Sequence, residues 1–274
     1  MNDFAPSRRS LLLGTLAAAA VGGAAAAAPK PDLIDAKWKT SGSGGDPDYG
    51  PWAEFLSRRL SMGSGGVALL DYAGGVGDRA QLSGWLTETQ KVDPTTLAPD
   101  AAFAWWVNLY NAVTIDLVLA DYPVDSIKEV KGGLFNTGPW GEKVAVVNGD
   151  RLSLDDIEHG ILRPIWKDPR IHYAVNCASI GCPNLKATPW TSATLEADLE
   201  AGARAYVNHP RGARFDGDGL VVSKIYEWFD EDFESSDAGV IAHLKQYAEG
   251  DLAAKLSGAT SISDTEYDWD LNAA

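Results

Sequence analysis

The sequence contains few of the side chains that hold metals or form covalent cross-links. Its 274 residues include only two cysteines, two methionines and four histidines. So few cysteines exclude a disulfide-rich scaffold, in which several bridges replace a large core. No second CxxC or HxxxH pair accompanies the cysteines, so a four-ligand zinc site would lack part of its shell. We therefore expect neither a metal nor another cofactor.

Positive charge is scarce as well. The chain has 23 Lys and Arg against 38 Asp and Glu, which gives a formal net charge of -15. Nucleic acids and anionic membrane surfaces attract proteins through basic patches. The charge balance argues against both as partners and is compatible with a small-molecule or peptide ligand. Nothing in the sequence fixes the oligomeric state.

Residues 1–28 have the parts of an export signal rather than those of a folded element. Arg8 and Arg9 lead into a run of leucines and then an alanine-rich run that ends at Ala28. A charged start, a short apolar run and small residues are typical of a secretory signal, and paired arginines indicate the twin-arginine type. A membrane anchor is the alternative, but alanine and glycine make this run too weakly apolar to hold a span. We expect a periplasmic or secreted protein with no integral span in the mature chain.

The remaining chain divides into a short linker and one domain. Residues 29–48 are polar and rich in glycine, a composition that cannot bury enough apolar surface to order itself. Residues 49–274 are long enough for one sizeable core and short for two. Segments with helical periodicity dominate them, and β-branched runs are few and short. We predict a single α+β domain that is predominantly helical and contains a small β-sheet.

Two asparagines interrupt the most apolar segment of this domain. The segment starts at Pro99-Asp100 and stops before Pro123, and apolar residues occur all round the helix that it predicts. Asn108 and Asn111 lie on one face of that helix because they are three residues apart. A buried carboxamide is costly unless its groups find partners. The pair therefore ties the backbone of a neighbouring loop into place, or orients a catalytic side chain or a bound ligand.

A second helix carries a glutamate at the margin of its apolar face. The helix opens at Ser153, where Asp156 imitates a capping box, and it ends at Arg163-Pro164. Glu158 lies beside the apolar stripe rather than opposite it. This carboxylate is therefore either partly buried beside a paired cation, for which Arg163 is a candidate, or solvated.

Both cysteines lie in one short stretch, IHYAVNCASIGCPNL, which also holds a histidine. Residues 171–175 predict a buried strand of the small sheet. If the strand continues regularly to Cys177, the side chains of His172 and Cys177 point to opposite faces. They converge only if the backbone turns at Asn176. A loop follows and contains Cys182.

Long motifs are spread along nearly the whole mature chain. They are FAWWVNLYNAVTI, LADYPVDSIK, LSLDDIEHGILRP, DPRIHYAVNCASIGCPNL, VSKIYEWFDEDF and YDWDLN. In this order they resemble the family known as domain of unknown function 547 (DUF547), and the chain is identified as an exported bacterial member. The resemblance implies a shared fold but no settled activity, and some relatives have serine in place of the second cysteine. The family pattern includes Asn108, Asn111, Glu158, His172 and Cys177.

Three interpretations of the cysteine pair remain open. In the first, Cys177 is the nucleophile of a hydrolase or acyl-transferase, His172 is its general base, and Glu158 or an asparagine orients the imidazole. In the second, Cys177 and Cys182 form a structural disulfide of a non-enzymatic periplasmic protein. Its ligand pocket would be built from the two asparagines and His172. In the third, the cysteines and histidines hold zinc, although the shell is incomplete.

Overall fold

The computed structural model describes residues 35–131 and 138–274, so the expected signal peptide lies outside the described residues. In this part of the chain helices predominate, and the strands form small sheets of two or three. The predicted α+β class, a mostly helical single domain, is confirmed. The elements in chain order are α1 (Asp35–Trp38), α2 (Gly50–Arg59), β1 (Leu60–Met62), β2 (Ala68–Leu70), α3 (Tyr72–Thr89), η1 (Pro94–Thr96), α4 (Pro99–Asp121), η2 (Ile127–Glu129), β3 (Ala145–Val147), β4 (Asp150–Leu152), η3 (Asp156–Leu162), α5 (Arg163–Trp166), η4 (Pro169–Tyr173), α6 (Leu195–Val207), β5 (Ala213–Asp216), β6 (Gly219–Ser223), α7 (Ile225–Trp228), η5 (Asp230–Phe233), α8 (Asp237–Tyr247), α9 (Gly250–Leu256) and β7 (Asp264–Glu266).

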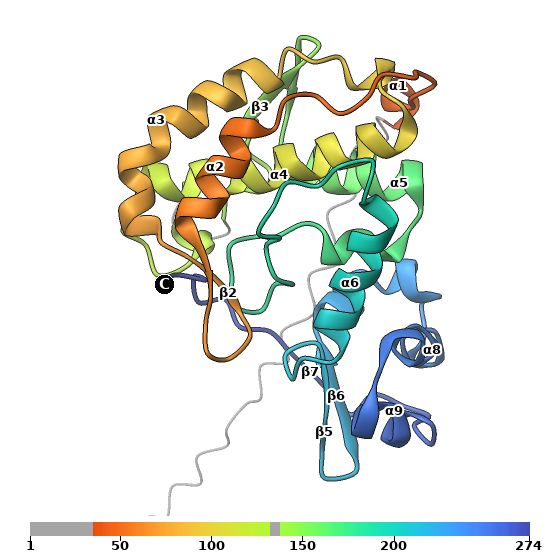
Figure 1. The fold of residues 1–274 in the computed structure, drawn as a ribbon. Coiled ribbons are helices and arrows are strands. Elements are labelled where there is room, and N and C mark those ends of the chain that lie inside the picture. The colour runs from red at the N-terminus through yellow and green to blue at the C-terminus, as the bar shows by residue number, and fades with distance from the viewer. Residues whose placement is uncertain (1–34, 132–137) are drawn as a thin grey trace, which may run out of the picture.

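Helix α4 is the central element of the larger part of the molecule, where α3 packs against it and α2 packs against α3 (Figure 1). A proline lies in its first turn, where the missing N–H group is not needed. All residues from Ala101 to Ile115 are buried, so an apolar sequence on every side meets protein on every side. Each large side chain buried in this way stabilises the fold by roughly 1.5–3 kcal/mol.

The same helix is long and apolar enough to cross a membrane, judged by length and composition alone. However, 94% of its apolar window is buried inside the protein. The domain itself therefore covers the apolar surface of α4, as it does for the core helix of a globular fold.

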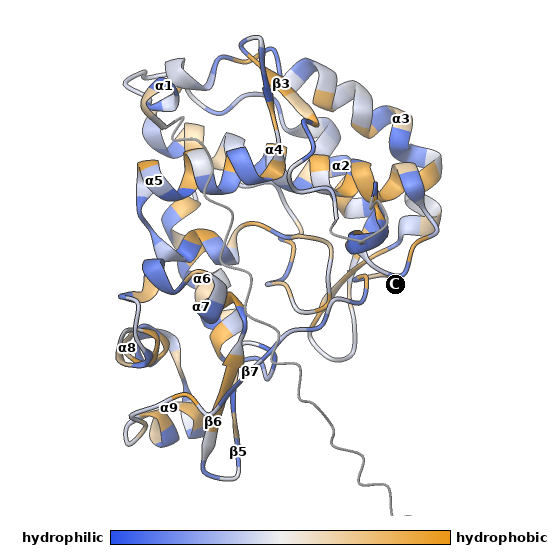
Figure 2. Cartoon of the chain, turned by 180° about the vertical axis from the view of Figure 1, so that it is seen from behind, coloured by the Kyte–Doolittle hydropathy of each residue, from blue (hydrophilic) through white to orange (hydrophobic). Residues whose placement is uncertain are grey.

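The buried side chains form two clusters that meet at the cysteine stretch. The larger cluster surrounds α4 and includes Trp52 and Val175. The smaller one lies among α6, β5, β6 and α8 and includes Tyr173 and Tyr206. Its strand β6 is mainly hydrophobic (Figure 2). Because Tyr173 belongs to one cluster and Val175 to the other, the chain passes between the clusters just before Cys177.

The sheets are antiparallel hairpins, and one of them gains a parallel strand near the C-terminus. Strands β3 and β4 form a hairpin around Asn148-Gly149, whose φ angles of 50° and 82° suit a tight turn. Strand β5 pairs antiparallel to β6, and β7 pairs parallel to β6. The C-terminal tail then runs back to the cysteine stretch, where Asn272 N donates a hydrogen bond to Ala178 O.

The strand predicted at residues 171–175 is wrong. Pro169–Tyr173 instead forms the short 3-10 helix η4, and an irregular segment leads from it to Cys177. Asp168 caps η4 through its side chain, and the following proline fixes the first turn. This local start signal outweighs the alternation of apolar and polar side chains. The small sheets therefore do not carry His172 or Cys177.

The linker expected at residues 29–48 is ordered from Asp35 onward. Helix α1 places Trp38 in the larger core cluster with 1% of its surface exposed. Gly44 pairs with Leu97 in an isolated parallel bridge. Burial of the Trp38 side chain stabilises this segment against the domain, although the rest of its composition is polar and rich in glycine. The folded domain consequently begins earlier than the sequence predicted.

Candidate functional site

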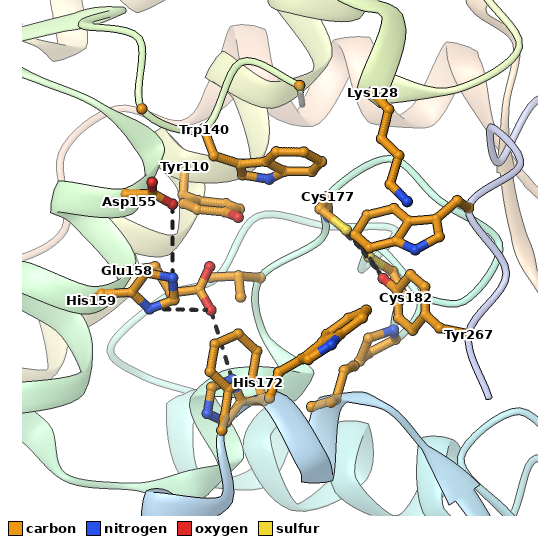
Figure 3. A pocket seen from close by; sticks show the side chains of 18 of the residues that line it. Tyr110, Lys128, Trp140, Asp155, Glu158, His159, His172, Cys177, Cys182 and Tyr267 are labelled. Carbon is orange, nitrogen blue, oxygen red and sulfur yellow. Dashed lines mark hydrogen bonds and ion pairs between the residues drawn. The ribbon is translucent and has the colours of Figure 1, made fainter. Parts of the chain in front are cut away.

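One cavity brings together the two cysteines, the histidine and the glutamate that the sequence singled out. It has a volume of about 770 Å³ and is lined by residues of both core clusters. Its walls are largely aromatic (Figure 3). A concave site with aromatic walls and a few convergent polar groups is the usual form of a small-molecule pocket. The lining rings are Tyr110, Trp140, Trp228, Phe229, Tyr267 and Trp269.

A buried imidazole lies between two carboxylates on one side of this cavity. His172 Nε2 lies 2.7 Å from Asp232 Oδ2, and His172 Nδ1 lies 3.7 Å from Glu158 Oε1. Asp232 also accepts a hydrogen bond of 2.6 Å from Arg163 Nε. Burial opposes the ionisation of Asp232, but the hydrogen bonds from His172 and Arg163 lower its pKa to about 2. Asp232 therefore stays charged and orients the imidazole, whose Nε2 carries a proton.

Glu158 is the carboxylate on the cavity side of this imidazole. It lies on the π-helix η3 and is only 7% exposed. Burial is the main cause that raises the pKa of Glu158, while His172, Tyr110 and Arg163 oppose the rise. Single π-helical turns are frequent at functional sites. A buried carboxyl group of raised pKa beside an imidazole is suited to proton transfer.

His159, the next residue of η3, is a different kind of group. Its Nδ1 lies 3.4 Å from Arg163 Nη1, and its Nε2 lies 3.8 Å from Asp155 Oδ1. Burial, with the nearby Arg163 as a second cause, lowers the pKa of His159 to about 3. The imidazole is therefore neutral at ordinary pH and serves as part of the cavity wall.

The two thiols form a contact pair on another side of the cavity. Cys177 Sγ lies 2.7 Å from Cys182 Sγ, and both residues are free cysteines in the described structure. Tyr267 OH lies 3.2 Å from Cys177 Sγ and 3.1 Å from Cys182 Sγ. Ser179 Oγ lies 3.4 Å from each sulfur, and the backbone N–H of Cys177 donates to Cys182 Sγ at 3.0 Å. Cys182 Sγ thus has both hydroxyl groups and a backbone N–H within reach.

These donors divide the charge of the pair unequally. Burial opposes the ionisation of Cys182, but hydrogen bonds from Cys177, Ser179 and Tyr267 lower its pKa to about 6. The hydrogen bond to Cys182 is the main cause that raises the pKa of Cys177, and burial is the second. Near neutral pH the pair therefore shares one negative charge, which the hydrogen-bond donors favour on Cys182. Cys177 is the more exposed of the two.

Amide side chains of α4 hold the backbone around this pair. Asn111 Nδ2 donates to Ala174 O at 3.0 Å, and Asn111 Oδ1 accepts from Asn176 N at 2.8 Å. Asn108 makes the same two-way connection to the backbone of Trp190. Among the described residues, neither of these α4 asparagines belongs to the cavity lining. The two asparagines therefore hold the backbone of neighbouring loops in place. They support the segment that leads to the thiol pair without lining the cavity themselves.

His172 and Cys177 line the same cavity without pairing. The backbone does turn at this point, because Ala178 has a left-handed φ of 62°. In the described structure, however, the imidazole bonds to Asp232 and the Cys177 thiol contacts Cys182 and two hydroxyl groups. Figure 3 shows the thiol pair beside Tyr267 and the imidazole with Glu158 on a different side. The thiol–imidazole dyad expected from the sequence is not formed in this arrangement.

Three residues that the sequence analysis did not single out complete the site. They are Asp232 beside the imidazole, Tyr267 beside the thiols, and Lys128, whose Nζ lies 3.8 Å over the ring of Trp269. All three fall within motifs that carry the family resemblance. Membership in these motifs could have marked the three residues as candidates, but only the fold shows which side chains of the motifs reach the cavity.

Comparison with known proteins identifies one family. Residues 94–207 match the family model described as Protein of unknown function, DUF547. The matched segment contains Glu158, His172 and Cys177, whereas Asp232 and Tyr267 lie beyond its end. No curated protein and no solved structure matches the chain. This segment of the chain is therefore similar to the DUF547 family, whose description assigns no function.

Proposed function

We propose that this protein is a thiol-dependent hydrolase or acyl-transferase with Cys177 as the nucleophile. The observation that carries the proposal is the contact pair of Cys177 and Cys182 in the wall of an aromatic cavity. A thiol becomes a strong nucleophile when a neighbouring base takes its proton. Cys182, held as a thiolate by its hydrogen-bond donors, takes that proton during the attack, because the sulfur of Cys177 becomes far more acidic as its new bond to carbon forms.

In the first step, Cys177 Sγ attacks the carbonyl carbon of an acyl donor. Its proton passes to the Cys182 thiolate, 2.7 Å away, while the carbonyl electron pair moves onto oxygen. Return of this pair expels an alcohol, amine or thiol and leaves a thioester on Cys177. Attack by water or by a second acceptor then releases the acyl group, and the proton on Cys182 returns to Cys177.

His172 and Glu158 serve the proton transfers on the substrate side of the cavity. The leaving group needs a proton, and the incoming water must lose one. Glu158 has a raised pKa and lies 3.7 Å from His172 Nδ1, so its carboxyl group can give a proton to the leaving group and take one from the incoming water. Asp232 acts as a positioning residue because it holds the far nitrogen of the same ring.

Acylation of the protein by an activated ester tests the nucleophile. With p-nitrophenyl acetate, intact mass spectrometry and peptide mapping should find one acetyl group, on Cys177, in the wild-type protein. Cys177→Ala should abolish the adduct, and Cys182→Ser should slow its formation. Acetylation that persists in Cys177→Ala, or a wild-type protein that stays unmodified with both thiols reduced, contradicts the proposal.

A non-enzymatic ligand-binding protein with a Cys177–Cys182 disulfide is the second candidate. The short distance between the two sulfurs favours it, because exported proteins commonly oxidise such pairs. The cavity would then bind a small molecule or peptide without reacting with it. A mature protein that loses two hydrogens relative to its reduced form, and takes up iodoacetamide only after reduction, would support this second candidate over the first.

We also propose that the protein acts outside the cytoplasm, in the periplasm or as a secreted protein. The support is the paired Arg8 and Arg9 before an apolar, alanine-rich run. Replacement of both arginines by lysine should keep the precursor in the cytoplasmic fraction of a bacterial host. Unchanged export of that variant would count against the twin-arginine route.

A further inference from the structure

We infer that the cavity accepts an acyl donor that carries an amino group, and that Asp155 binds this group. The inference rests on the proposed function, because it names the substrate class of the same site. It starts from an asymmetry of charge: Asp155 and Glu158 lie at one end of the cavity, and Lys128 lies near the thiol pair at the other end (Figure 3).

The Asp155 carboxylate lines the cavity without a close partner among the described residues. His159 Nε2 lies 3.8 Å from Asp155 Oδ1, beyond hydrogen-bond distance, and that imidazole is neutral. Lys143 pairs directly with Asp156 and acts on Asp155 only through its charge. Only 20% of the Asp155 side chain is exposed, so water satisfies this carboxylate poorly. An ammonium group would supply the missing donors and the opposite charge.

Like charges add to the need for a cation at this end. Burial is the main cause that raises the pKa of Asp155 to about 6; the neighbouring carboxylates of Glu158 and Asp156 contribute to the rise, and Lys143 opposes it. Asp155 N also donates to Trp140 O at 3.0 Å, which holds this acidic end close to an aromatic wall of the cavity. Aromatic faces attract cations, so the wall favours the same kind of ligand.

The positive charge at the opposite end of the cavity orients the bound ligand. Lys128 Nζ lies 3.8 Å over the Trp269 ring, and its ammonium charge interacts with Cys177. This lysine repels a second ammonium group and leaves the acidic end as the favoured place for it. A substrate whose amine lies at Asp155 extends its remaining atoms toward the thiols. The substrate class is therefore an amine-bearing ester, thioester or amide, such as an amino-acid or peptide derivative.

Binding of matched aromatic probes to the full mature protein tests this inference without any reaction. We would titrate 2-phenylethylamine and 2-phenylethanol into the Cys177→Ala protein and follow the fluorescence of the cavity tryptophans. These probes share size and ring and differ in charge. We expect the amine to bind at least about tenfold more tightly than the alcohol, as a partly buried ion pair would give. Asp155→Asn should remove this preference, and the exposed Asp251→Asn in α9 should keep it.

The outcomes separate this inference from the proposed function. Equal binding of both probes, or a preference for the amine that survives both Asp155→Asn and Asp155→Ala, overturns the acidic subsite. The acetylation of Cys177 is measured independently with an uncharged ester and is unaffected by that result. Conversely, a protein that prefers the amine but never acetylates Cys177 retains the subsite and loses the thiol chemistry.

Discussion

The Tyr267 hydroxyl lies 3.2 Å from Cys177 Sγ, although 90 positions separate the two residues in the chain. The tail that carries Tyr267 is fixed to the cysteine loop by backbone hydrogen bonds from Ile180 N to Asp270 O and from Gly181 N to Asp268 O, each 2.8 Å long. The C-terminal segment therefore sets the geometry and the charge of the thiol pair.

Replacing Tyr267 with phenylalanine should weaken the thiolate. The hydroxyl donates to the ionised sulfur, and its loss should raise the pKa of the Cys182 thiol. A single lost donor corresponds to a fall of roughly fivefold in the alkylation rate of the pair at pH 6. Iodoacetamide kinetics followed by intact mass would measure it. An unchanged rate would show that the phenol does not stabilise the thiolate.

The pH dependence of alkylation should reflect the shared proton of the two thiols. Because the pKa of Cys182 is lowered to about 6, the rate should rise from pH 5 to pH 7 and then level off. An ordinary thiol, such as N-acetylcysteine measured in parallel, continues to gain reactivity up to its own pKa of roughly 8.5. Cys182→Ser should move the profile of Cys177 toward that of the free thiol. A wild-type profile that coincides with N-acetylcysteine contradicts the shared charge.

Replacing Asn111 with alanine should destabilise the domain. The variant leaves Ala174 O and Asn176 N buried without their partner. Two unsatisfied backbone groups cost about 2–4 kcal/mol of unfolding free energy. Urea denaturation would measure the loss, with the exposed Gln81→Ala in α3 as a control that changes stability little. A loss below about 1 kcal/mol would show that water or a rearranged loop replaces the amide.

Replacing Asp155 with asparagine should stabilise the free protein at alkaline pH. The folded state raises the pKa of this carboxyl from 3.8 to about 6, so it binds the proton more tightly than the unfolded chain does. The contribution of Asp155 to the free energy of unfolding is therefore most favourable below pH 4. It falls by up to about 3 kcal/mol as the pH rises through 6. Asp155→Asn should raise the free energy of unfolding at pH 8 and leave it nearly unchanged at pH 4. Equal effects at both values would exclude this electrostatic origin.

Adding a methyl group at Gly181 should disturb the contact between the cysteine loop and the tail. A Cβ atom there would lie 2.8 Å from Asp268 O, which is closer than real side chains approach. Gly181→Ala should cost about 1–3 kcal/mol and slow alkylation of Cys177, because the two segments must separate. Gly77→Ala is a matched control in α3, where a Cβ atom meets open space. That control should stabilise the helix by about 0.5–1 kcal/mol.

Some elements could be predicted because their signals are local. The apolar run between two prolines defined α4, and Asn148-Gly149 marked the turn between β3 and β4. The segment around His172 was predicted wrongly for an equally local reason. Its alternating pattern suggested a strand, while the Asp168 cap and the following proline favoured a 3-10 helix.

The sequence by itself determined the mostly helical α+β class, the charge balance and the stretch that holds both cysteines, because composition and periodicity express these directly. Only the tertiary structure decided what surrounds each reactive group. It paired His172 with Asp232 and brought Tyr267 to the thiols, and these contacts join segments 60 and 90 positions apart. Such contacts depend on how the two core clusters pack, and no spacing within one motif encodes that packing. For this reason Cys177 kept its place at the centre of the site while its expected partner changed from an imidazole to a second thiol.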